Sequence, residues 1–221
     1  MGKYIGKKVI WAVICIIAIT LLITGLIIFA GMDDPALIAL EKPVIYLYPE
    51  SETDVQVWLN LDGQLGFTYP AYDDGWYVTA YPDGTLINHN DGNEYNCLFW
   101  EGSSSVDAIT STGFIVAGCD TVDFLRDKLE FMGLIPKEYN EFIIYWAPKM
   151  HSNAYNLITF QNNAYTDTAE LIIIPSPDSI LRIFMTFTPL EKPIIIPEQQ
   201  LETFERAGFT VVEWGGAELN R

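Results

Sequence analysis

Basic residues are scarce in this chain. Its 221 residues contain 12 Lys and Arg against 29 Asp and Glu, a formal net charge of −17. Three of the lysines precede residue 9, so residues 33–221 hold nine basic and all 29 acidic residues, a net charge of −20. A nucleic-acid-binding protein needs a basic face for the phosphates. The charge balance therefore excludes nucleic acid as a partner.

Charge of either sign is absent from residues 9–30, which read VIWAVICIIAITLLITGLIIFA. A helix of this length extends roughly 33 Å, enough to cross the hydrocarbon core of a bilayer. The run is longer than the apolar region of a cleaved signal peptide, and no small-residue cleavage site follows it. The sequence therefore predicts an uncleaved transmembrane signal anchor over residues 9–31.

The charges on either side of this anchor differ in sign. Three lysines lie in residues 1–8, whereas Asp33 and Asp34 follow the apolar run. The positive-inside rule then predicts a single-pass protein of the plasma membrane with a cytoplasmic tail at residues 1–8. A tether at 32–42 would connect the anchor to an extracytoplasmic domain at 43–221.

Linkers rich in Gly and Ser or in Pro are missing from residues 43–221, so we predict one domain there. Apolar residues alternate with polar ones over 54–61, which is typical of a half-buried strand, and turn signals predict an antiparallel meander over 43–101. Helical spacing predicts a helix over 121–133 and a short helix that starts at Pro136. Further strands are expected at 113–118, 142–146, 155–160, 171–174 (central in its sheet because it is wholly apolar), 181–187 and 209–214, and a short helix at 199–207. The predicted fold class is α+β, mainly antiparallel sheet with two or three short helices, preceded by one transmembrane helix.

Metal-binding and nucleotide-binding motifs are also missing. The chain has two histidines, no H-E-x-x-H, no close cysteine pair, no P-loop and no G-x-G-x-x-G. Residues 88–94 resemble a calcium loop in composition, but with Gly92 in the sixth position the first position is Ile87, which has no side-chain oxygen. We therefore expect no cofactor and no metal site, apart from weak, unlocated binding of divalent cations by the acidic surface.

Cysteine is rare, with three in the whole chain, and Cys15 lies in the apolar run. Cys97 and Cys119 are the pair left in the domain. A disulfide between them suits an extracytoplasmic compartment and would stabilise the fold by roughly 3 kcal/mol. Two free thiols on separate strands fit the sequence equally well, because it does not give the distance between the two β-carbons.

Two glutamates, Glu101 and Glu213, lie at strand ends beside tryptophan and before glycine. Glycoside hydrolysis needs two carboxylates about 5 to 9.5 Å apart. Indoles that stack on sugar rings would come from Trp76, Trp100 and Trp214. The plainer interpretation is that both carboxylates lie at the rim of the domain and that the indoles lie in the core. The sequence favours this interpretation, because it does not fix the distance between two carboxylates in segments so far apart in the chain.

Polar side chains of residues 153–163 form a second group of binding candidates. Asn156 and Gln161 are the amides most suited to hydrogen bonding with sugar hydroxyls, although loops are often rich in amides. Alternation also places Glu213 on the same strand face as Phe209 and Val211, where a carboxylate must be paired or hydrated. If Glu213 is buried as an ion pair, its candidate partners are Arg182 and Arg206.

Three segments carry a resemblance to a protein family: KPVIYLYPE at 42–50, LFWEG at 98–102 and GFTVVEWGG at 208–216. They resemble an uncharacterised family of exported, membrane-attached proteins from Gram-positive bacteria, and the resemblance covers nearly all of residues 42–216. It implies export and a single domain. The family has no assigned activity, so the resemblance assigns no catalytic residue.

Motifs of nucleophilic catalysis, such as G-x-S-x-G and S-x-x-K, are absent as well. The leading interpretation is therefore a non-catalytic module that binds a glycan or a protein partner of the cell envelope close to the membrane. A hydrolase of envelope carbohydrate that uses Glu101 and Glu213 is the first alternative. An accessory subunit of a membrane complex, held through the apolar helix, is the second.

Overall fold

The structure is a computed structural model that describes residues 11, 17, 20, 37–161 and 163–219. Residues 37–221 form a compact unit of their own, distinct from residues 1–36. The predicted anchor at 9–31 lies outside the described residues except for three positions within it. Among the residues that are described, no helix is long and apolar enough to cross a membrane.

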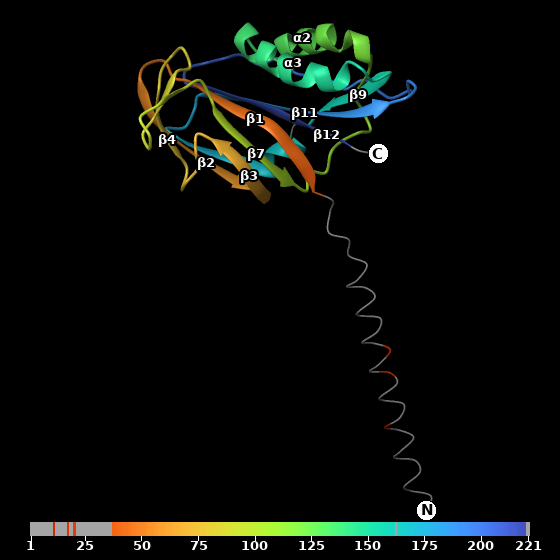
Figure 1. Cartoon of the computed structure of the whole chain (residues 1–221), viewed down its shortest axis with the longest axis horizontal. Helices are drawn as coiled ribbons and strands as arrows, with labels where there is room; N and C mark the ends of the chain where they lie inside the picture. The colour runs from red at the N-terminus through yellow and green to blue at the C-terminus, as the bar shows by residue number, and fades with distance from the viewer. Residues whose placement is uncertain (1–10, 12–16, 18–19, 21–36, 162, 220–221) are drawn as a thin grey trace, which may run out of the picture. The chain divides into compact units, whose positions relative to one another are not determined.

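A seven-stranded sheet, called here the large sheet, runs through the middle of the domain (Figure 1). Its strands lie in the order β3-β7-β1-β12-β11-β9-β8, and every neighbouring pair is antiparallel except β11 and β12, which are parallel. The strands are β1 (Ile38–Tyr48), β3 (Gly63–Tyr69), β7 (Leu98–Ser104), β8 (Phe114–Ala117), β9 (Tyr155–Phe160), β11 (Ser179–Leu190) and β12 (Thr210–Glu218).

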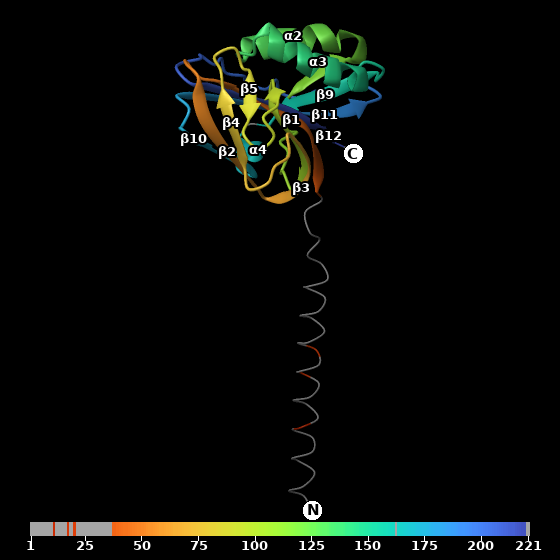
Figure 2. The same cartoon turned by 60° about the vertical axis from the view of Figure 1, so that its left-hand side comes forward.

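A five-stranded antiparallel sheet, called here the small sheet, has the order β10-β2-β4-β5-β6. Its strands are β2 (Thr53–Leu61), β4 (Trp76–Ala80), β5 (Leu86–Asn88), β6 (Glu94–Tyr95) and β10 (Ala169–Ile174). In the turned view its strands β2, β4 and β5 lie in front, beneath the level of the helices (Figure 2). The expected meander over 43–101 is thus antiparallel, but its strands are divided between the two sheets.

Three layers result from the way these elements pack. Helices α2 (Thr121–Phe131) and α3 (Pro136–Met150) cover one face of the large sheet, and the small sheet covers the other face. A short 3₁₀ helix, η1 (Gly118–Asp120), leads into α2, and α4 (Asn163–Thr166) leads towards β10. The predicted α+β class with mainly antiparallel sheet is confirmed.

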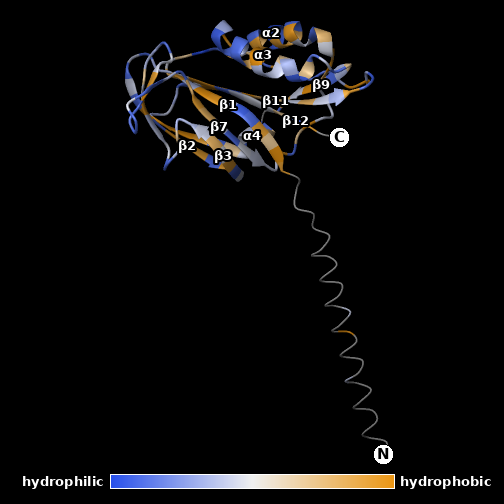
Figure 3. Cartoon of the chain, in the orientation of Figure 1, coloured by the Kyte–Doolittle hydropathy of each residue, from blue (hydrophilic) through white to orange (hydrophobic). Residues whose placement is uncertain are grey.

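The central strands are apolar on both faces because both faces are buried. On β1, Val44 and Tyr46 point to the helices, while Ile45 and Leu47 point to the small sheet. Hydrophobic residues accordingly recur along β1, β2 and β7, and the loops at the far end of the sheets are largely hydrophilic (Figure 3). The small sheet differs, because no element among the described residues 37–161 and 163–219 covers its outer face.

The expected strand at 142–146 is wrong: these residues lie within α3. Pro136 begins the helix, and the Glu138 carboxylate accepts a hydrogen bond from the Ile135 N–H at 2.9 Å, which caps its first turn. Phe142, Trp146 and Met150 are buried on the side that faces the large sheet. Their spacing of four residues places them on one helical face, and this period outweighs the short extended-looking run.

The expected helix at 199–207 is also wrong, because this segment is irregular. The Gln199 amide accepts a hydrogen bond from the Phe160 N–H at 2.9 Å and donates one to the Phe160 carbonyl at 2.7 Å. These bonds hold the chain along the sheet in place of helical hydrogen bonds. Arg206 further down the segment forms an ion pair with the buried Glu138.

Three other expectations differ from the structure. The apolar strand β10 is an edge strand and not a central one, with Ile172 and Ile174 on the solvent side at 45% and 55% exposure. Strand β3 follows the turn at Asp62 directly and was not expected, since its residues show no clean apolar alternation. Strand β1 begins at Ile38, so part of the expected tether at 32–42 belongs to the sheet.

Candidate functional site

Glu213 is fully buried between the two sheets. Its carboxylate forms an ion pair with Arg182, with 2.6 Å between Nε and Oε2, and accepts a hydrogen bond from the Trp100 Nε1 at 3.2 Å. Arg182 stands directly opposite Glu213 in the parallel pair of β11 and β12. Of the two partners named from the sequence, Arg182 is therefore the one that pairs with Glu213. These contacts tie three strands of the large sheet together.

Glu101 is placed differently. It follows Trp100 on β7 and stands opposite Phe67 of β3. Because successive residues of a strand point to opposite faces, Glu101 projects away from the side on which Trp100 reaches Glu213. The two carboxylates therefore lie on opposite faces of the large sheet and do not flank a common space for a glycosidic bond.

The three indoles proposed for sugar stacking are all in the core. Trp76, Trp100 and Trp214 are at most 1% exposed. The Trp76 indole donates a hydrogen bond to the Pro70 carbonyl at 3.0 Å, and Trp214 packs edge-on against Phe142 of α3. None of these rings has a face open to a ligand in this structure.

The two amides proposed for sugar recognition are buried as well. Asn156 donates to the Met150 carbonyl at 3.1 Å, which joins β9 to the end of α3. Gln161 accepts a hydrogen bond from the Ile109 N–H at 2.8 Å and donates to the Ile109 carbonyl at 2.9 Å. Both amides hold neighbouring backbone in place.

Cys97 and Cys119 are free thiols in the structure. Cys97 is partly buried just before β7, whereas Cys119 is exposed in η1. Burial, together with the nearby Glu141, raises the pKa of the Cys97 thiol to about 11. Within the part of the chain that the structure describes, no three His, Cys, Asp or Glu side chains come together to hold a metal ion.

The outer face of the small sheet has exposed aromatic and polar side chains, which the predicted site lacks. Along β2 and β4, buried apolar residues alternate with residues that point outward to solvent. The outward residues include two aromatic side chains. The Trp58 and Tyr77 rings meet edge to face, with their centroids 6.0 Å apart, and both are partly exposed. The outer face consists of Asp54, Gln56, Trp58, Asn60, Tyr77, Thr79, Tyr81, Ile87, His89, Glu94, Glu170, Ile172 and Ile174.

The position of the Trp58 indole is fixed by the backbone beside it. Gly75 has a φ of +126°, and a β-carbon there would lie 2.8 Å from the Trp58 Nε1. Only glycine adopts this conformation at low cost and leaves room for the indole. Ile172 stands opposite Trp58 on the neighbouring strand β10.

Hydrogen-bonding side chains lie next to the two rings. The Thr79 hydroxyl donates to the Asp54 carboxylate at 2.7 Å and contacts the His89 Nε2 at 2.8 Å. The His89 Nε2 is also 3.5 Å from that carboxylate. All three residues are on the solvent side of the sheet, so the free oxygens and nitrogens of the group are open to a polar ligand.

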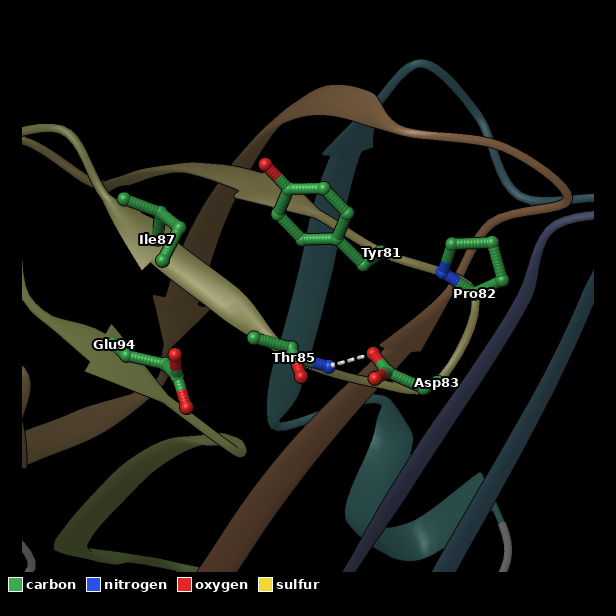
Figure 4. Close-up of a pocket in the computed structure, with 6 residues that line it drawn as sticks. All are labelled: Tyr81, Pro82, Asp83, Thr85, Ile87 and Glu94. Atoms are coloured by element: carbon green, nitrogen blue, oxygen red, sulfur yellow. Dashed lines mark hydrogen bonds between the residues drawn. The ribbon is translucent and has the colours of Figure 1, made fainter.

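A shallow hollow of about 540 Å³ continues this face over the β4–β5 hairpin. Tyr81, Thr85 and Ile87 come from the two arms of the hairpin, and Glu94 comes from the next strand (Figure 4). The Asp83 carboxylate accepts the Thr85 N–H at 2.9 Å, which shapes the turn and lowers the pKa of that carboxyl. The hollow adds a third aromatic ring to the outer face.

The sequence carries a signal for this surface in the alternation of β2. The alternation of 54–61 identified Val55, Val57, Leu59 and Leu61 as the buried side, so Trp58 was on the opposite, outward side. A single exposed aromatic residue is ordinary, but several that lie side by side on one face are a sign of binding. Tyr77 occupies an outward position on β4, opposite Gln56, and its ring meets that of Trp58.

Comparisons with known proteins give one informative match. The chain is 40% identical over 89 residues to an uncharacterised protein encoded in the bglA 3′ region of Butyrivibrio fibrisolvens, and the matched part is 39% of this chain and 91% of that protein. No family model matches the chain. No solved structure matches it either.

Proposed function

The chain belongs to the same family as the uncharacterised Butyrivibrio fibrisolvens protein, and we propose that it is a membrane-anchored, non-catalytic module that binds a glycan at the outer face of the small sheet. The observation that carries this proposal is the partly exposed pair of Trp58 and Tyr77. Aromatic rings offer apolar faces to the C–H groups of a sugar ring, and they keep a fixed orientation at little cost in entropy.

The side chains around the rings suit the same class of ligand. Sugar hydroxyls both donate and accept hydrogen bonds, and Gln56, Asn60 and His89 can also do both. Asp54 adds a strong acceptor. Binding sites for small ligands combine apolar surface with a few polar groups in fixed positions, and the outer face has this composition.

The cellular location is part of the proposal. A signal anchor at 9–31 with lysines on its N-terminal side would hold the domain outside the cytoplasmic membrane. The alternative of a hydrolase using Glu101 and Glu213 receives no support from the geometry, because the ion pair with Arg182 occupies one carboxylate and the other projects from the opposite face.

An array of envelope and plant-cell-wall oligosaccharides, probed with the detergent-solubilised full chain, tests the proposal. The matched variants are Trp58→Ala and Phe67→Ala, which remove exposed aromatic rings from the outer face and from β3 respectively. We expect the wild type and Phe67→Ala to bind the same glycans and Trp58→Ala to lose at least about tenfold in affinity. Binding that survives in Trp58→Ala and disappears in Phe67→Ala would place the site on β3 instead.

A further inference from the structure

We propose that the outer face selects glycans that carry free amino groups, such as polymers of glucosamine, over neutral and anionic ones; this inference rests on the proposed function. It comes from the distribution of charge. No Lys or Arg occurs between Lys42 and Arg126, and β10 has none either, so all five strands of the small sheet lack basic residues. Three of the five strands carry an acidic residue, namely Asp54 on β2, Glu94 on β6 and Glu170 on β10.

Two of these acids lie on either side of the Trp58 indole. Asp54 is four residues away on the same strand, and its side chain is 76% exposed. Glu170 lies on β10, two residues from the partner of Trp58, a diagonal that places Cα atoms about 7–8 Å apart. The Glu170 carboxylate accepts a hydrogen bond from Asn60 at 3.2 Å and is otherwise open to solvent. Four strand residues span about 13 Å. An oligosaccharide that stacks on the indole and extends along β2 would therefore have one carboxylate on each side of the stacked ring, for the amines of different sugar residues.

The basic residues of the domain do not neutralise this face. Arg182 is buried between the sheets and paired with Glu213, and Arg206 is paired with Glu138. Lys137 of α3 reaches the β4–β5 turn, where its ammonium donates to the Asp83 backbone carbonyl at 3.3 Å. Among residues 37–161 and 163–219, Asp54 and Glu170 have no Lys or Arg partner, and the one ionisable nitrogen near Asp54 is the His89 Nε2 at 3.5 Å.

The ligand class follows from these charges and rings together. Phosphate or carboxylate polymers would be repelled, because their charge has the sign of the face. A protonated amine is attracted both by the carboxylates and by the π-face of tryptophan, which is the best aromatic acceptor for a cation. Each exposed charge pair contributes about two- to fivefold in affinity, so two of them suffice for a preference of roughly tenfold.

Two defined probes test the inference: the hexamer of glucosamine and the hexamer of N-acetylglucosamine. They differ in the charge of the nitrogen substituent on a shared backbone. Calorimetric titrations of the full chain in detergent at pH 6 and low salt keep the carboxylates ionised and the amines protonated. Asp54→Asn with Glu170→Gln removes the two charges and keeps the side-chain shapes. Asp127→Asn with Glu130→Gln removes two exposed acids from α2 as the matched control.

We expect the wild type and the α2 control to prefer the glucosamine hexamer by at least about tenfold, and the outer-face double variant to lose most of that preference. Trp58→Ala should weaken the binding of both probes. Equal affinity for the two hexamers, with both dependent on Trp58, would overturn the amine preference and leave the proposed function in place. Failure of both hexamers to bind overturns the amine preference, and the oligosaccharide array then decides the proposed function by itself. A preference that is unchanged in the outer-face double variant also overturns the inference, because it assigns the attraction to the net charge of the chain.

Discussion

Trp100 and Glu213 lie between the two sheets with no exposure to solvent, whereas Trp58 and Asp54 lie on the outer face of the small sheet. Each pair combines an indole with a carboxylate. In the interior, the indole N–H and a guanidinium satisfy the carboxylate, so that pair contributes to the fold. On the outer face the same groups remain open to a ligand. The two pairs contain the same residue types. The difference between a structural cluster and a candidate binding site is whether another layer of the domain packs against that face of the sheet.

The largest expected effect comes from breaking the interior cluster. Arg182→Leu leaves Glu213 as a buried, unpaired charge, which should lower the free energy of unfolding by about 3–5 kcal/mol. Replacing both partners with leucine should recover much of the loss, because no charge then remains buried. Urea unfolding of the full chain in detergent measures both. A loss below about 1 kcal/mol for Arg182→Leu would mean that water reaches Glu213.

A substitution beside the outer face should have an intermediate effect. Gly75→Ala introduces a β-carbon at a φ of +126° and 2.8 Å from the Trp58 Nε1. We expect a loss of about 1–3 kcal/mol in unfolding free energy from backbone strain, and weaker glycan binding because the indole is displaced. Unchanged glycan affinity in a folded Gly75→Ala protein would show that the orientation of Trp58 does not matter for binding.

A partly exposed ion pair on the helical side should matter less. Lys149 at the end of α3 pairs with Glu41 of β1, and the Lys149 and Glu41 side chains are 33% and 26% exposed. Because solvent screens such a pair, Lys149→Met should cost about 1 kcal/mol or less. Thermal and urea unfolding of Lys149→Met and Arg182→Leu, measured side by side, would show how strongly the contribution of an ion pair to the free energy of unfolding depends on its burial. Equal losses for the two variants would contradict this dependence.

The smallest effect concerns reactivity rather than stability. Cys97 should react slowly with iodoacetamide at pH 8, because its pKa of about 11 leaves little thiolate, and Cys119 should react first because it is exposed. Raising the pH towards 10 should increase the rate at Cys97 in the folded protein by roughly tenfold per pH unit. Peptide mapping of the alkylated chain resolves the two sites. Faster reaction at Cys97 than at Cys119 would contradict its partial burial.

Much of the fold follows from local patterns. The alternation of 54–61 predicts β2 with its buried side, and the spacing of 121–133 predicts α2 to within two residues. The pattern fails at 142–146, where five apolar and aromatic residues fit a strand and a helix equally until Met150 extends the helical period. It also fails at 199–207, because side-chain hydrogen bonds from Gln199 to the distant Phe160 hold that segment, and such contacts leave no local signal.

The candidate site was harder to predict than the fold. Glu101 and Glu213 share a sequence context, but their faces depend on how β7 and β12 are placed on either side of β1. Trp58 has no motif around it, and its importance depends on the absence of a layer over the small sheet. Which sheet face stays uncovered is decided by the packing of the whole domain, and a single sequence does not specify it in any one segment.

Hydroxyl-radical footprinting of the full chain, with and without the glucosamine hexamer, tests the central claim most directly. Trp58 is the one tryptophan among residues 37–219 that is not buried, so its oxidation reports on the outer face. The account predicts that the hexamer protects Trp58 and Tyr77 and leaves Phe67 of β3 and Ile144 of α3 unchanged. Protection of Phe67 or Ile144, with Trp58 still oxidised at its original rate, would contradict the placement of the binding site on the small sheet.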